Sequence, residues 1–176
     1  MTTTPENEQQ HHALFVYTDE LHFAAMVNRM LRHAADAQVN VRFFLPTPLS
    51  QILVQQAQVL GMPDEQCAPL GDVQQTPPQM HWHVLQAQRE ARSTAHIQGL
   101  WLIHDLSCLL DQPSLLAETE KTLSHLVQQG GLTLFCVSGP LQSLSEKELI
   151  WLFENHPYYY QGGSFQPLPH DNHPHS

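Results

Sequence analysis

The chain has 176 residues, which suits a single domain with a sizeable core, and 41% of them are hydrophobic. Seven Lys and Arg against 17 Asp and Glu give a formal charge of -10, which disfavours direct binding to nucleic acids or anionic membranes. No apolar run approaches membrane-spanning length and no signal-peptide pattern is present, so we expect a cytoplasmic protein without membrane insertion.

Strands and helices alternate along the first half of the chain. Apolar, β-branched runs that are typical of buried strands occupy residues 12–17 and 39–45. Each run is followed by apolar side chains at three- and four-residue spacing, which predicts amphipathic helices from Leu21 and from Leu49. The second helix ends at Gly61, and the Pro- and Gly-rich residues 62–79 are predicted to be a loop with at most a short strand.

The second half continues the alternation. We expect helices over residues 81–96, 114–129 and about 146–153, and strands over 97–103, 132–137 and 158–160. A capping-box-like pattern at residues 113–118 opens the second of these helices, and residues 143–148 cap the third.

Strands separated by helices predict an α/β fold with a mostly parallel sheet and helices on both faces. We expect one domain over residues 12–163, between a disordered N-terminal tail at 1–11 and a disordered Pro- and His-rich tail at 164–176.

Three blocks of the chain, in order, resemble the MEDS domain, the DcmR-like sensory domain of prokaryotic signalling proteins. They are HHALFVYTDELHFAAMVNRMLRHA, LLAETEKTLSHL, and LTLFCVSG with ENHPYYYQGG, and the resemblance covers residues 11–163. Cys136 ends a strand of the last block, His156 and Pro157 follow one helix later, and Glu120 matches an acidic helix position of the family.

The resemblance implies a RecA- or KaiC-like fold that has lost its nucleotide machinery and serves as a sensory or interaction module. The implied partner is a signalling protein such as a kinase, a regulator or a transcription factor, and self-association is left open. The chain departs from the family pattern at Trp101, at His104-Asp105 and at Cys108, and again at Ser138 and Gly139.

Parallel strands bring the residues that follow them to one rim of the sheet, where ligands of such folds bind. We therefore predict a ligand- or partner-binding rim made of Tyr17, Thr18, Asp19, Thr47, His104, Asp105, Ser138 and Gly139.

The chain lacks the residues that phosphate-cleaving enzymes need. The chain has no GxxxxGK[ST] motif, and its only lysines, Lys121 and Lys147, fall in predicted helices. Asp105 ends a strand as the magnesium-holding acid of P-loop enzymes does, but capping of the next turn explains it better. We expect no enzyme activity; a degenerate RecA-like nucleotide-binding regulator is the alternative.

The histidines and cysteines of the chain have simpler explanations than metal or thiol chemistry. The chain has 13 histidines, but His81 and His83 diverge on a helix, and the histidines of the C-terminal tail are a compositional feature. Cys136 could pair with His104 or His156, although a cysteine inside LTLFCV is more typical of inert core. Three cysteines without CxxC spacing indicate reduced thiols. We therefore expect no metal, cofactor or catalytic residue; a His-based pH or metal sensor is a third hypothesis.

Overall fold

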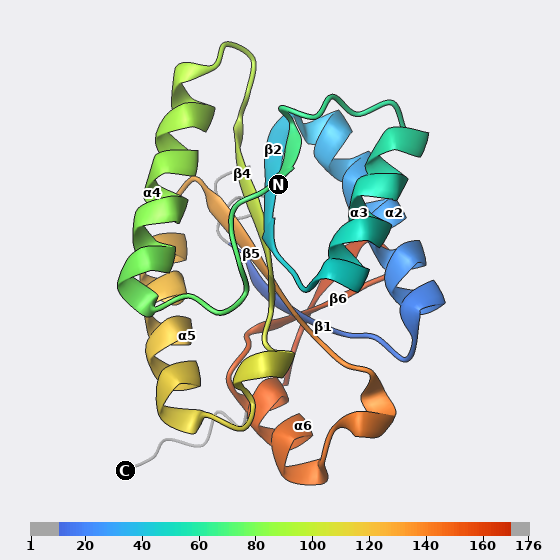
Figure 1. The fold of residues 1–176 in the computed structure, drawn as a ribbon, viewed down its shortest axis with the longest axis vertical. Coiled ribbons are helices and arrows are strands. Elements are labelled where there is room, and N and C mark those ends of the chain that lie inside the picture. Colours follow the sequence, from blue (N-terminus) through green and yellow to red (C-terminus); the bar gives the residue numbers. More distant parts are fainter. Residues whose placement is uncertain (1–10, 170–176) are drawn as a thin grey trace.

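A seven-stranded sheet in the order β3-β2-β4-β5-β1-β6-β7 forms the centre of the computed structural model, which describes residues 11–169 (Figure 1). All neighbouring strands are parallel except β7, which is antiparallel to β6. The strands are β1 (His12–Val16), β2 (Val39–Phe44), β3 (Cys67–Pro69), β4 (Gly99–Asp105), β5 (Leu132–Ser138), β6 (Tyr158–Gln161) and β7 (Ser164–Pro167). The predicted α/β fold is confirmed.

Helices cover both faces of this sheet, as predicted (Figure 1). One face is covered by α2 (Glu20–Ala37) and α3 (Thr47–Val59), and the other by α4 (Pro77–Ser93), α5 (Pro113–Gln128) and the short α6 (Glu146–Glu154). Two apolar cores result: Phe23 and Leu53 pack on the first face, and Val84, Leu123 and Leu152 on the second. Because both faces are covered, every residue of β1, β2 and β5 is buried, which explains their continuous apolar runs.

Residues 62–79 contain the short strand that the sequence allowed, but the helix that follows begins within this stretch. β3 pairs with β2, and α4 begins at Pro77, earlier than the predicted residue 81. Its start is fixed by a capping box, in which Thr76 accepts a hydrogen bond from the Gln79 amide and the Gln79 side chain accepts one from the Thr76 amide.

The capping box predicted at residues 113–118 is wrong. The residue before α5 is Gln112, whose side chain makes no capping hydrogen bond, and Pro113 opens the helix. Proline is well suited to this position because its missing N–H would have no helical partner there. The cap expected at residues 143–148 is confirmed, since Ser145 and Glu148 form a capping box at α6.

The predicted disordered tail starts too early. Residues 164–167 form β7, which makes a hairpin with β6 through a two-residue turn at Gly162 and Gly163. Both glycines have positive φ, 60° and 85°, as the tightest hairpin turn requires of its central residues. The expectations for residues 1–10 and 170–176 lie outside the described part of the chain.

Candidate metal centre

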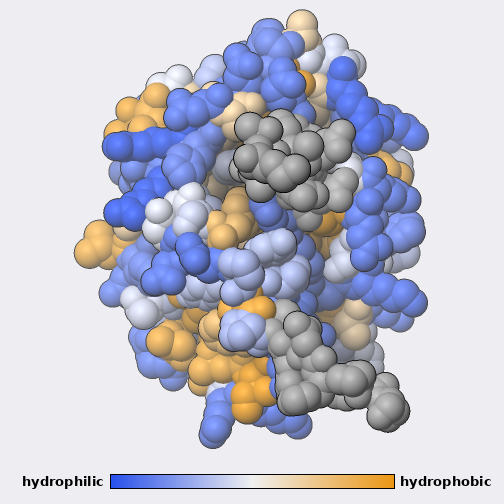
Figure 2. All heavy atoms as spheres, turned by 180° about the vertical axis from the view of Figure 1, so that it is seen from behind, coloured by the Kyte–Doolittle hydropathy of each residue, from blue (hydrophilic) through white to orange (hydrophobic). Residues whose placement is uncertain are grey.

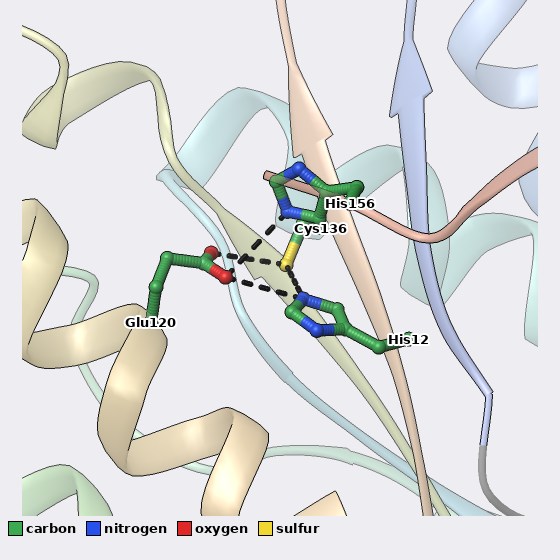
Figure 3. A group of neighbouring side chains, drawn as sticks. All are labelled: His12, Glu120, Cys136 and His156. Carbon is green, nitrogen blue, oxygen red and sulfur yellow. Dashed lines mark hydrogen bonds and ion pairs between the residues drawn. The ribbon is translucent and has the colours of Figure 1, made fainter. Parts of the chain in front are cut away.

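Four side chains meet beneath α5, on the sheet face that α4, α5 and α6 cover: His12, Glu120, Cys136 and His156 (Figure 3). All four are buried, and one donor atom from each lies within 4.8 Å of the others.

Neighbouring parallel strands supply the first two donors. On β1, His12 alternates with Leu14 and Val16, so its side chain shares their sheet face. On β5, Cys136 lies beside Leu14 in register and joins the same core. The Nε2 atom of His12 and the Sγ atom of Cys136 are 3.3 Å apart.

Helix α5 places a carboxylate above these two strands. Glu120 lies four residues after Leu116 and three before Leu123, so it falls on the apolar stripe that faces the sheet. Its Oε1 atom accepts a hydrogen bond from the Cys136 thiol at 3.3 Å, and its Oε2 atom is 3.2 Å from Nε2 of His12.

The fourth donor follows α6. His156 is almost completely buried, and its Nε2 atom is 3.5 Å from Oε2 of Glu120. Its Nδ1 atom donates a hydrogen bond to the Leu152 carbonyl at 2.6 Å, because a carbonyl can only accept. The Nδ1 atom of His12 is likewise engaged, 3.3 Å from the Ser124 hydroxyl. Both imidazoles are thus held through Nδ1 with Nε2 turned inward, the arrangement that outer partners impose on metal-binding histidines.

The negative charges that the buried Glu120 and Cys136 side chains can carry must be offset by bound protons or by a cation. Burial alone would raise the pKa of Glu120, but hydrogen bonds and charge from His12 and His156 hold it below its usual range. Burial and the negative charge of Glu120 raise the pKa of the Cys136 thiol well above its ordinary value. A bound divalent cation removes this conflict, because it deprotonates a coordinating thiol and balances the charges of one thiolate and one carboxylate.

Several separations between the donor atoms are close to those around a tetrahedral ion. Zinc binds sulfur at about 2.3 Å and nitrogen or oxygen at about 2.0 to 2.2 Å, so the edges of such a tetrahedron measure roughly 3.3 to 3.8 Å. Oε2 of Glu120 is 3.2 Å from His12 and 3.5 Å from His156, and His12 is 3.3 Å from Cys136, while the donor atoms together lie within 4.8 Å of one another. The residues present therefore fit a zinc-type ion in chemistry, and three of their separations are close to tetrahedral edges.

His104 lies next to this cluster. It pairs in register with Cys136 across β4 and β5 and is completely buried, whereas we predicted it at the ligand-binding rim. Neither of its ring nitrogens has a hydrogen-bond partner within the described part of the chain. Burial lowers the pKa of His104 to about 4, so the ring is neutral at physiological pH.

Most of the predicted rim is occupied by its own hydrogen bonds. Asp105 accepts a hydrogen bond from the Ser107 amide at 2.9 Å, which confirms that it caps the following turn. The Ser107 hydroxyl donates to the Gly139 carbonyl, accepts from the Gly139 amide and lies 3.4 Å from the Ser138 hydroxyl. A Cβ atom at Gly139 would come within 2.7 Å of the Tyr17 carbonyl oxygen. These residues are brought together, but they form a closed structural network.

The remaining rim residues are exposed and belong to helix starts. Asp19 caps α2 by accepting a hydrogen bond from the His22 amide at 2.8 Å, and the Thr18 amide donates to Nδ1 of His22. Thr47 opens α3, which follows β2, two strands away from β5 in the sheet. Asp19 and Glu20 place negative charge where the phosphate loop of a nucleotide-binding protein would need positive charge.

The sequence pointed to only part of the metal centre. For Cys136 the sequence favours inert core over a pair with His156, and Glu120 is indicated only by the family resemblance. Nothing pointed to His12. The one available signal was a carboxylate inside the apolar stripe of a helix, because Glu is almost never buried without a partner.

No protein-family model matches the chain, and no curated protein matches its sequence. Among solved structures, the ATPase domain of a RecA-like helicase matches with a TM-score of 0.57 and 8% identity, over 87% of this chain and 70% of that one. At this identity the likeness shows the fold alone, and the chain has a RecA-like α/β fold. Within residues 11–169, no helix is both long and apolar enough to cross a membrane.

Proposed function

We propose that the chain is a non-enzymatic sensory or adaptor domain whose input is a divalent transition metal bound by His12, Glu120, Cys136 and His156. The observation that carries this proposal is the convergence of four buried donors, one sulfur, one oxygen and two nitrogens, within 4.8 Å of one another. Zinc fits this mixed set of sulfur, nitrogen and oxygen donors best, because it accepts all three in tetrahedral geometry.

The donor set favours a regulatory role over catalysis. Four protein donors fill a tetrahedral shell and leave no position for a substrate, which is the pattern of closed zinc sites. Cys136 and His156 are buried, so neither offers a nucleophile or a base to a substrate from solution. A closed centre of this kind acts by stabilising one conformation of the domain.

The resemblance to the MEDS domain supports the sensory side of the proposal. The three blocks of that resemblance include all four donors. On this proposal the chain reports metal occupancy to a signalling partner, such as a kinase, a regulator or a transcription factor, through protein contact. We did not expect a metal from the sequence, and the proposal departs from that expectation because of the cluster geometry.

Cobalt substitution tests the metal centre. Purified chain, stripped with chelator and titrated with Co²⁺, should bind one equivalent and develop the intense absorption of a cobalt-thiolate bond. Cys136→Ser should abolish this absorption and reduce affinity for Zn²⁺ at least tenfold. Cys67→Ser removes another buried thiol, on β3 and outside the cluster, and should leave both unchanged. Absence of metal binding by the unmodified chain would refute the proposal.

The alternative, a nucleotide-binding regulator, rests on the RecA-like fold alone. The capped, acidic start of α2 argues against a phosphate site there. On the metal proposal, ATP should cause no saturable thermal shift in the unmodified chain. A shift that Asp105→Ala removes would favour the nucleotide proposal instead.

A further inference from the structure

A pocket on the opposite face of the sheet from the metal centre lies between α2 and the β6–β7 hairpin. Its volume is about 320 Å³, at the lower end of the range for small-molecule sites. Phe15 and Met26 supply apolar lining, while Arg29, His22 and Tyr160 supply polar groups.

The described side chains that line this pocket include a positive charge and no negative charge. No acidic residue is among the described residues that line it, and within residues 11–169 Arg29 has no carboxylate within 4 Å. The Tyr160 hydroxyl is buried and has no hydrogen-bond partner in the same part of the chain. Burial raises the pKa of Tyr160 to about 12 while the charge of Arg29 opposes that rise, so the hydroxyl is a protonated donor near the guanidinium.

A third donor comes from His22. Its Nδ1 atom accepts a hydrogen bond from the Thr18 amide at 3.0 Å, so in the neutral ring the proton lies on Nε2. The hairpin turn closes the pocket at its other end, where the position of a Cβ atom at Gly162 lies 3.7 Å from the Arg29 guanidinium. The pocket is therefore bounded by donors from α2 and by the turn that follows β6.

We propose that this pocket binds a small organic carboxylate, with the carboxylate at Arg29 and Tyr160 and a short apolar body against Phe15 and Met26. A chain with 17 acidic and seven basic residues repels anions in general. Arg29 is exposed and, within residues 11–169, has no carboxylate within 4 Å, and it lies beside a buried hydroxyl without a partner in the same range, so a carboxylate can satisfy both groups. The apolar lining favours an organic acid over an inorganic anion. This inference is independent of the metal centre.

Hexanoate is a suitable probe, with hexan-1-ol as its neutral counterpart and inorganic phosphate as the bare anion. Titrated into the full chain and followed by NMR, hexanoate should shift the signals of the Phe15 ring and the Met26 methyl group in a saturable way. Hexanol and phosphate should each bind at least tenfold more weakly, because hexanol lacks the negative charge and phosphate lacks the apolar chain.

Variants distinguish this site from general anion binding. Arg29→Gln should weaken hexanoate binding about tenfold or more, since a charge-assisted hydrogen bond is lost, and Tyr160→Phe should weaken it severalfold. Arg32→Gln removes an exposed arginine from the same helix, outside the pocket, and should have less than a twofold effect. No saturable binding of hexanoate, equal binding by Arg29→Gln, or tighter binding of phosphate than of hexanoate would each overturn the proposal.

Discussion

Each donor of the metal centre is a side chain whose burial is costly unless another polar group lies beside it. Glu120 satisfies this condition through Cys136 on one carboxylate oxygen and through His12 and His156 on the other. Removal of one member takes a partner away from the others, so the cluster gains or loses its function as a unit.

His104 provides a residue-scale prediction, because its two ring nitrogens are buried without partners among the described residues. An unsatisfied buried polar group is destabilising, so His104→Leu should raise the free energy of unfolding by about 1 kcal/mol. Urea denaturation of metal-free chain measures this change, with His125→Leu on the exposed side of α5 as the control. A loss of stability, or of cobalt absorption, in His104→Leu would instead show that His104 holds a partner or the metal.

The helices and strands were largely predictable from the sequence, whereas the places where their side chains come together were not. Uninterrupted apolar runs identified β1 and β5, because helices cover both faces of the sheet. β7 was missed because the Pro- and His-rich composition after residue 163 indicated disorder, although Gly162 and Gly163 are typical of a hairpin turn. The centre was missed because its donors come from two strands, one helix and one connection that only the strand order brings together.

Helix α6 is the element whose position should depend most on the metal. It has nine residues and only Leu152 is buried, while Ile150 is 50% and Phe153 39% exposed. Figure 2 shows hydrophobic surface gathered at the lower end of the molecule, the end at which α6 lies in Figure 1. His156 joins the end of α6 to the centre through its hydrogen bond to Leu152. We infer that metal binding suppresses local opening of α6, since ligands stabilise the conformation that binds them.

Hydrogen exchange measures this effect. Zinc should slow exchange of the amides in residues 146–160 at least tenfold, about 1.4 kcal/mol, and should slow the fraying ends of α2 much less. In His156→Ala the difference between zinc and chelator should vanish, whereas His22→Ala, on the other face, should retain it. Equal slowing in α2 and α6, or none in α6, would contradict a role for the metal in positioning α6.

At the scale of the molecule, the chain keeps a RecA-like sheet but carries its polar centre away from the rim where ligands of such folds usually bind. The rim is closed by hydrogen bonds among Asp105, Ser107 and Gly139. The four donors instead join the first strand to the last helical connection, so a bound ion links segments from both ends of the domain. On the metal proposal, metal binding and global stability are therefore coupled.

This coupling predicts a thermal shift that depends on one carboxylate. At free zinc about 100 times above the dissociation constant, stabilisation amounts to about 2.7 kcal/mol, which raises the Tm of a chain of this size by roughly 5 to 10 °C over chelator-treated protein. Glu120→Gln preserves side-chain shape but removes the charge that balances the ion, so most of the shift should disappear. Glu118→Gln alters an exposed carboxylate on the same helix and should keep the full shift. Scanning calorimetry with zinc and with chelator compares the three proteins, and a shift of equal size in both variants would place the stabilising ion outside the centre.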